Sequence, residues 1–297
     1  MKRELKFNET IRRASSISCL LLFICRLVIA QHDGSKLQNL KLSGKVKYLE
    51  ENSYIFEEKE GKQINIEKIC GKGTQFAEDV HLSFDKNGNE LEEDDFGTNG
   101  KLDYTHLTYY NSSGNEIERD WYKPDRTIVS KRKRKYDSAS HKLEDDFYNS
   151  KDSITQTNLY KYDLNGHLIE EFGYKSDKSQ LYRFTYINND SGRKVSQTSY
   201  DEKGKVRCKW IYNYDATGNI TEQITRSGDT AITSRFTCQY DKYGNEVEKK
   251  QYNLNNTTKI LEVDSWITSR YEYDKNGNWL KKIMSDRTMV IRKIKYY

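Results

Sequence analysis

The chain has 297 residues, of which 35% are hydrophobic, 32% charged and 12% aromatic, with 23 Tyr and a single Pro. The apolar content is low for one globular core, whereas the many Tyr residues argue against a disordered chain. The net charge is +5, but residues 1–30 hold six Lys/Arg and two Asp/Glu, so residues 31–297 carry about +1. The basic character therefore belongs to the N-terminal segment and does not indicate a nucleic-acid partner.

Residues 1–30 have the pattern of a secretory signal peptide. The basic region contains Lys2, Arg3, Lys6, Arg12 and Arg13. An apolar run follows at Ile17–Cys25, too short for a membrane span, and Ala30 precedes a predicted cleavage before Gln31. We therefore expect a secreted, periplasmic or cell-surface protein with no membrane span after cleavage. A lipoprotein acylated at Cys25 and an uncleaved anchor are the alternatives.

The next part of the chain precedes the repeats described below. Residues 31–43 have the composition of a short linker. Residues 44–79 alternate polar and apolar side chains, which predicts N-terminal capping strands at Lys45–Leu49, Ser53–Phe56 and Gln63–Ile66.

From residue 80 to residue 297 one unit recurs. Glycines stand at positions 88, 114, 166, 192, 218 and 244, and Ser140 fills the one gap, so each step is 26 residues. The last step, Gly244 to Gly277, is 33, which places an insertion of about seven residues within Asn253–Ser265. Three residues before each of these positions stands Asp85, Asn111, Asp137, Asp163, Asn189, Asp215, Asp241 or Asp274. The Asp or Asn side chain can start a turn, and Gly supplies the left-handed conformation that closes it. Ser140 is expected to be the most strained turn.

A 26-residue period fits two strands of about nine residues and two turns. Aromatic residues recur in step with the turns. Four residues before the turn position lie Phe84, Tyr110, Tyr136, Tyr162, Asn188, Tyr214, Tyr240 and Tyr273. The pattern predicts an all-β protein, an elongated antiparallel meander or solenoid-like sheet of about 16–19 strands that ends at Val290–Tyr297. No helix is predicted after residue 30.

The unit resembles the tyrosine–aspartate (YD) repeat of Rhs-type proteins. The motif is clearest in Tyr160–Gly166, Tyr212–Glu222 and Tyr271–Asn278. It is most similar to the small secreted YD-repeat proteins of Bacteroidota, whose repeats favour Gly-Asn. The resemblance covers about 80–297, and Gly44–Lys47 is similar to the usual opening. It implies β-hairpin repeats but no particular activity, because such folds serve several functions. No toxin, protease or core-cleavage motif of the large Rhs toxins is present.

The best candidate for ligand contact is a set of seven aromatic residues on neighbouring predicted strands. They are Phe184, Tyr186, Trp210, Tyr212, Tyr214, Phe236 and Tyr240. Side chains at alternate positions of a strand share a face, so these rings are expected to form an aromatic floor. Arg183, Arg207 and Arg235 flank it and are expected to reach anionic groups. Packing within a Tyr ladder is the alternative.

The charged residues are better explained by structure than by catalysis. Glu92, Glu118, Glu144 and Glu170 occupy one repeat position. The basic run Lys131–Lys135 lies between two of the acidic strands, which predicts cross-strand charge pairs.

No metal or cofactor site is predicted. His141 and His167 share one position just after the turn but lack a third ligand. The calcium-like sequences at Asp85 and Asp274 lack the Glu that a calcium loop needs at its end. Cys208 and Cys238 are predicted to be too far apart for a disulfide.

We therefore expect an exported, non-catalytic β-repeat protein of the cell envelope that binds glycan or protein through the aromatic face. An enzyme is disfavoured because no set of polar residues interrupts the repeat. The alternative is a structural or shielding Rhs-like module without a small ligand.

Overall fold

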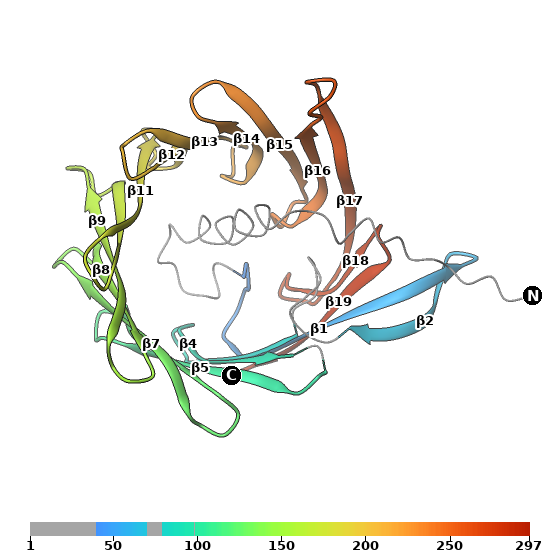
Figure 1. Cartoon of the computed structure of the whole chain (residues 1–297). Helices are drawn as coiled ribbons and strands as arrows, with labels where there is room; N and C mark the ends of the chain where they lie inside the picture. The colour runs from blue at the N-terminus through green and yellow to red at the C-terminus, as the bar shows by residue number, and fades with distance from the viewer. Residues whose placement is uncertain (1–39, 70–78, 98) are drawn as a thin grey trace, which may run out of the picture. The chain divides into compact units, whose positions relative to one another are not determined.

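The computed structural model describes residues 40–69, 79–97 and 99–297. The predicted signal peptide, most of the predicted linker and Cys70 lie outside these residues. The described residues form nineteen strands and no helix (Figure 1). The strands are β1 (Val46–Lys59), β2 (Lys62–Ile69), β3 (Val80–Phe84), β4 (Glu90–Phe96), β5 (Leu102–Tyr110), β6 (Glu116–Tyr122), β7 (Ile128–Tyr136), β8 (Lys142–Asn149), β9 (Ile154–Tyr162), β10 (Leu168–Lys175), β11 (Gln180–Asn188), β12 (Lys194–Tyr200), β13 (Val206–Tyr214), β14 (Ile220–Ser227), β15 (Ala231–Tyr240), β16 (Glu246–Leu254), β17 (Leu261–Tyr273), β18 (Trp279–Met284) and β19 (Thr288–Tyr296).

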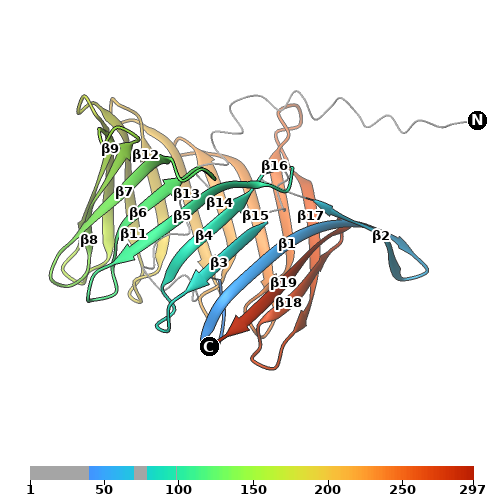
Figure 2. The ribbon, with the colours of Figure 1, turned by 90° about the horizontal axis from the view of Figure 1, so that it is seen from below.

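The strands form one antiparallel sheet that closes on itself. From β3 to β19 each strand pairs with the next, and β1 pairs with β19 on one side and with β3 on the other (Figures 1 and 2). The result is an 18-strand β-barrel, with β2 outside the ring and paired to β1. The all-β antiparallel prediction is confirmed. The prediction of an elongated, open meander or solenoid is wrong.

Regularly spaced β-bulges give the physical reason for closure. In the hairpins from β3 to β17 and in the β17–β18 hairpin, the strand after each turn skips one residue in its register, whereas β18 and β19 pair without a skip. The skipped residues after the glycine turns are Leu91, Ile117, Leu143, Ile169, Val195, Thr221, Val247 and Leu280. Those after the second turns are Asp103, Val129, Thr155, Leu181, Arg207, Thr233 and Asp264. A bulge bends its strand and increases twist, so bulges repeated in step curve the sheet.

The Asp-x-x-Gly turns form as predicted. In a representative turn, the Asp163 carboxylate accepts hydrogen bonds of 2.9 and 2.8 Å from the backbone N–H groups of Asn165 and His167. Gly166 has φ +81°. Ser140 takes the same left-handed conformation, with φ 65°. This backbone is costly for a residue with a Cβ, as the sequence predicted.

Successive turns also stack on one another. A Cβ built on Gly166 would lie 2.5 Å from Nε2 of His141, the residue just after the preceding turn. On Gly192 it would lie 2.7 Å from Nε2 of His167. Glycine at these two positions leaves room for the imidazole of the preceding turn and supplies the left-handed backbone conformation.

A buried apolar cluster lies where the ring closes. Val46, Leu49, Leu82 and Phe84 form a buried cluster, and Leu49 is paired directly with Leu82 across β1 and β3. A second small cluster of Phe56, Ile283 and Met289 packs where the β1–β2 hairpin meets β18 and β19. Within the described ranges, no helix is long and apolar enough to cross a membrane.

Candidate functional site

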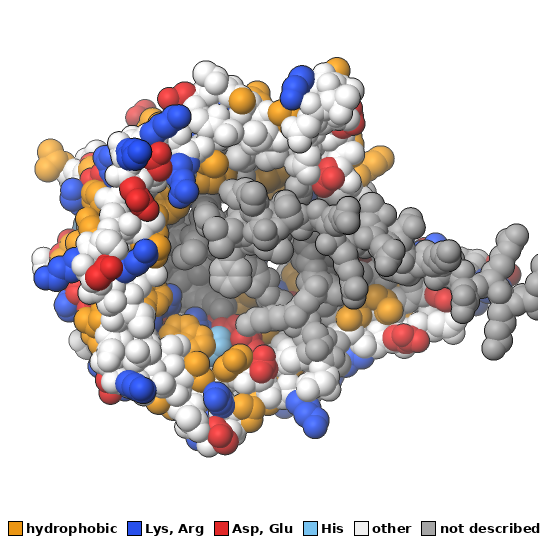
Figure 3. All heavy atoms as spheres, in the orientation of Figure 1, with side chains coloured by type: hydrophobic (Ala, Val, Ile, Leu, Met, Phe, Trp, Pro, Cys, Tyr) orange, Lys and Arg blue, Asp and Glu red, His pale blue; other side chains and the backbone are white. Residues whose placement is uncertain are grey.

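The two faces of the closed sheet differ in accessibility. Along β13, Trp210 and Tyr212 are buried, whereas Arg207 and Asn213, which point the other way, are exposed. Side chains on the concave side of a closed sheet converge, so we assign the more buried side to the interior and call it the inner face. Figure 3 shows Lys, Arg, Asp and Glu side chains spread over the outside of the ring.

Strand register brings the predicted aromatic residues onto the inner face, from β11, β13 and β15. The ring centroids of Phe184 and Trp210 are 6.3 Å apart. Gln197 of β12 lies between Tyr186 and Trp210, since it is paired with both. In the same way, Gln223 of β14 lies between Tyr212 and Phe236.

Most of these rings are engaged in packing. Tyr186, Trp210 and Tyr212 are only 9%, 6% and 2% exposed. The hydroxyls of Tyr214 and Tyr240 donate hydrogen bonds of 2.5 and 2.7 Å to the carbonyl oxygens of Lys194 and Ile220. Phe184 and Phe236 are partly accessible.

The flanking arginines do not join the aromatic residues. Arg183 and Arg235 alternate with inner-face positions and point outward, where they pair with Glu170 at 2.7 Å and with Glu222 at 2.5 Å. Arg207 is an exposed bulge residue.

Two charged residues that the sequence did not place in the aromatic set lie beside it. Glu171 accepts hydrogen bonds from the hydroxyls of Tyr182 and Tyr186, at 2.7 and 2.8 Å. The Lys194 ammonium donates to Gln197 at 3.0 Å and lies 5.5 and 5.0 Å from the ring centroids of Tyr186 and Tyr212. Burial lowers the pKa of Lys194 to about 8, against the opposing effect of Glu171. The signal in the sequence was weak, because the two residues stand at different repeat positions.

A second part of the inner face, from β4 to β8, carries ion pairs. Arg119 pairs with Glu93 at 2.7 Å and with Glu90. Arg134 bridges two carboxylates, Glu116 at 2.8 Å and Asp145 at 3.0 Å. Burial favours the neutral form of both acids, but the basic neighbours outweigh it and hold the pKa of Glu116 and of Asp145 below the usual values. This part of the inner face is hydrophilic, and its charged side chains are neutralised by the ion pairs that they form with one another.

On the outer face the predicted cross-strand charge pairs are present. Lys133 lies 3.7 Å from Glu118, and Lys135 lies 2.5 Å from Glu144. The repeated Glu position thus serves pairing between neighbouring strands. Because these pairs are partly exposed, each contributes little to stability.

The polar side chains of the turns interact with residues of their own turn. Nδ1 of His141 lies 2.9 Å from the Asp137 carboxylate. The carboxylates of Asp85 and Asp274 accept backbone N–H groups of their own turns. No group of three or more His, Cys, Asp or Glu in the described part of the chain is placed to hold a metal.

Cys208 and Cys238 are not in a disulfide. They lie on β13 and β15, with β14 between them, as the sequence predicted.

Comparisons give no family assignment: no family model and no curated protein matches the chain. Solved structures with similarity include a Photorhabdus luminescens Tc holotoxin pore, at 13% identity and TM-score 0.36, over 79% of this chain and 13% of that one. A porin-like protein from Bacteroides uniformis has 10% sequence identity and a TM-score of 0.41, and the match covers 85% of this chain and 98% of that one. A TcdB2–TccC3–Cdc42 structure has 15% sequence identity and a TM-score of 0.35, and the match covers 83% of this chain and 16% of that one. The chain thus spans less than a fifth of these toxin chains. All three TM-scores are below 0.5, too low to support a family or a function.

Proposed function

We propose that the chain is an exported, non-catalytic shell protein whose repeats build a closed hydrophilic wall. One observation supports this proposal: five of the tyrosines that lie four residues before a turn link neighbouring hairpins through hydrogen bonds. Their hydroxyls donate to a backbone carbonyl twenty residues earlier, in the pairs Tyr110–Glu90, Tyr136–Glu116, Tyr162–Lys142, Tyr214–Lys194 and Tyr240–Ile220.

The size of the ring supports a role in enclosure. A closed sheet of this strand number is wider than its own side chains can fill. Its inner face presents tyrosines and ion pairs such as Arg134–Asp145, which suit a polar guest. The guest would be a polypeptide segment.

The inner-face carboxylates support a non-catalytic role. Both oxygens of Glu171 accept from tyrosine hydroxyls. Those of Asp145 are engaged by Arg134, Lys142 and Tyr160. A carboxylate held in this way is a poor general base, because it must break existing hydrogen bonds to take a proton.

Glycan binding on the aromatic set is the second candidate. The partly accessible rings of Phe184 and Phe236 could pack on the apolar C–H faces of a sugar. The Lys194 ammonium, beside two rings, supplies a hydrogen-bond donor to a hydroxyl group.

One double variant separates the two candidates. Trp210→Ala with Tyr212→Ala is made in residues 31–297, with exposed Trp266→Ala as the matched control. Circular dichroism and urea unfolding report folding, and a glycan array reports binding. The shell proposal expects no array binding by the wild type and loss of cooperative unfolding in the double variant.

The glycan proposal expects wild-type binding that disappears in a folded double variant. A folded double variant from a wild type that binds no glycan would contradict both candidates. Export itself is checked by mass spectrometry of the mature protein, which should begin at Gln31.

A further inference from the structure

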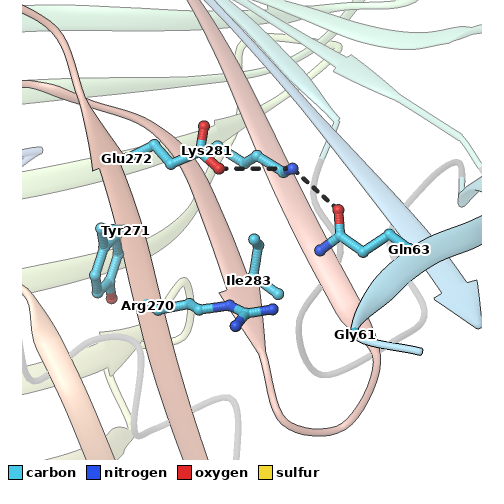
Figure 4. Close-up of a pocket in the computed structure, with 7 residues that line it drawn as sticks. All are labelled: Gly61, Gln63, Arg270, Tyr271, Glu272, Lys281 and Ile283. Carbon is cyan, nitrogen blue, oxygen red and sulfur yellow. Dashed lines mark hydrogen bonds and ion pairs between the residues drawn. The ribbon is translucent and has the colours of Figure 1, made fainter. Parts of the chain in front are cut away.

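The β1–β2 hairpin leaves the ring and contacts β18 and β19. Phe56 of β1 packs on Ile283 and Met289, and the Lys281 ammonium donates a 3.0 Å hydrogen bond to Oε1 of Gln63. Between the hairpin and the ring lies a pocket of about 380 Å³ (Figure 4). It is lined by Gly61, Gln63, Arg270, Tyr271, Glu272, Lys281 and Ile283.

One buried hydrogen-bond donor in this pocket lacks an acceptor, and an exposed arginine lies beside it. Nε2 of Gln63 is buried and has no partner among the residues that the structure describes. The Lys281 contact fixes the orientation of the amide, because Oε1 must face the ammonium. Among the residues that the structure describes, Arg270 forms no ion pair. Its guanidinium points toward the Gln63 and Gly61 side of the pocket (Figure 4). Buried donors normally find acceptors, so Gln63 indicates an unfilled position.

The charge of the lining is positive. Arg270 and Lys281 each contribute a positive charge, and the one acidic lining residue, Glu272, lies 3.7 Å from Lys281. Glu272 is largely exposed, so solvent screens it. The volume lies within the range of small-molecule sites, and Ile283 provides an apolar surface.

We propose that this pocket binds a small polar molecule through an oxyanion, either a carboxylate or a phosphate. The planar guanidinium of Arg270 would take two anion oxygens side by side, a geometry that Lys cannot supply. Nε2 of Gln63 would donate a third hydrogen bond, and Lys281 would add charge from the rim. The site lies outside the ring and is independent of the proposed shell function.

Isothermal titration calorimetry of residues 31–297 tests the proposal with glucuronate, glucose 6-phosphate and glucose. We expect at least one anion to bind, more weakly at high salt, and glucose not to bind. Preference between the two anions identifies the oxyanion. Arg270→Met should weaken binding by about tenfold or more, because a charge-assisted pair is lost. Arg207→Met, an exposed arginine on β13, is the matched control and should bind as the wild type does.

Gln63→Glu is a second, independent variant. The new carboxylate keeps a partner for Lys281, so the hairpin stays docked, but it replaces the Nε2 donor with a negative charge and should abolish anion binding. The proposal is overturned if neither anion binds at about 10 mM, a weak-affinity limit. Equal binding of glucose, or unchanged binding in folded Arg270→Met or Gln63→Glu, would also overturn it.

Discussion

The hydroxyl of Tyr110 lies 2.9 Å from the carbonyl oxygen of Glu90, twenty residues earlier, and donates a hydrogen bond to it. The two residues belong to adjacent strands, β5 and β4, of successive repeats. Asn188 occupies the same repeat position as Tyr110, and its amide donates at 2.8 Å to the carbonyl of Leu168, again twenty residues earlier. In the six repeats from Tyr110 to Tyr240 the position therefore supplies a donor that reaches the previous hairpin, and an aromatic ring is not needed for it.

Tyr110→Phe removes this donor and keeps the ring. We expect the free energy of unfolding to fall by about 0.5–1.5 kcal/mol, the usual net value of one hydrogen bond. Urea unfolding followed by tyrosine and tryptophan fluorescence measures it. Tyr243→Phe, at a turn residue that is 44% exposed, should have little effect. Equal losses in the two variants would contradict the role assigned to the Tyr110 hydroxyl.

Gly166→Ala and Gly114→Ala separate backbone strain from close approach. Both glycines have φ +81°, so each substitution carries the left-handed cost of about 1–2 kcal/mol. At Gly114 a Cβ meets nothing within 4 Å, whereas at Gly166 it would lie 2.5 Å from the His141 ring. Gly166→Ala should therefore lower the thermal midpoint further, and adding His141→Ala should remove part of the difference. If His141→Ala leaves the difference in thermal midpoint between Gly166→Ala and Gly114→Ala unchanged, the stacking of successive turns is refuted.

Ser140→Gly should stabilise the protein, because Ser140 has φ 65° in a turn whose equivalents carry glycine. The gain should be about 0.5–1 kcal/mol, since loss of the 2.9 Å hydrogen bond from Asn115 to the Ser140 hydroxyl offsets part of the relief. Ser138→Gly in the same turn is the control. Ser138 has no left-handed backbone to relieve, so its variant should be neutral or destabilised. Thermal unfolding of the two variants makes the comparison.

The free energy of unfolding should fall in acid through Asp145. Burial favours the protonated acid, but Lys142 and Arg134 outweigh it, so the folded pKa lies below the unfolded one. The stabilisation is present above the unfolded pKa, near 3.9, and is lost as the pH falls through the folded pKa.

Asp145→Asn should flatten this dependence by up to one proton, or about 1.4 kcal/mol per pH unit. Urea titrations between about pH 2 and 7 measure the slope. Asp103→Asn, at an exposed bulge, is the control. A wild-type slope in Asp145→Asn would show that the buried pair does not couple to acid unfolding.

Local features of the fold could be predicted from the sequence. Asp163 and Gly166 predict their turn because only a few residue types adopt its backbone conformation. The 26-residue spacing leaves room for two strands in each repeat. Closure could not be predicted in this way. Bulge residues such as Leu143 and Ile169 recur at one repeat position, but their spacing alone does not determine how strongly the sheet curves or whether its first and last strands meet.

The surroundings of the aromatic residues could be predicted only in part, for a related reason. Alternation along one strand places Trp210 and Tyr212 on one face, and this can be read from sequence. Glu171 and Lys194 come from different repeat positions, and only the strand register brings them to the same tyrosines. The pocket depends on contact between Gln63 and Lys281, which are 218 residues apart.

The pairing of β1 with β19 has a consequence for how the chain folds. Hairpins from β3 to β19 can zip together from neighbours in sequence, but Val46 must find Tyr296, at the opposite end of the chain. Such a distant contact is entropically costly and slow to form. Until the last strand is available, β1 and β18 each keep an unpaired edge able to recruit another chain. Truncation of the nine residues of β19 should therefore yield an aggregating chain, and not a slightly smaller ring.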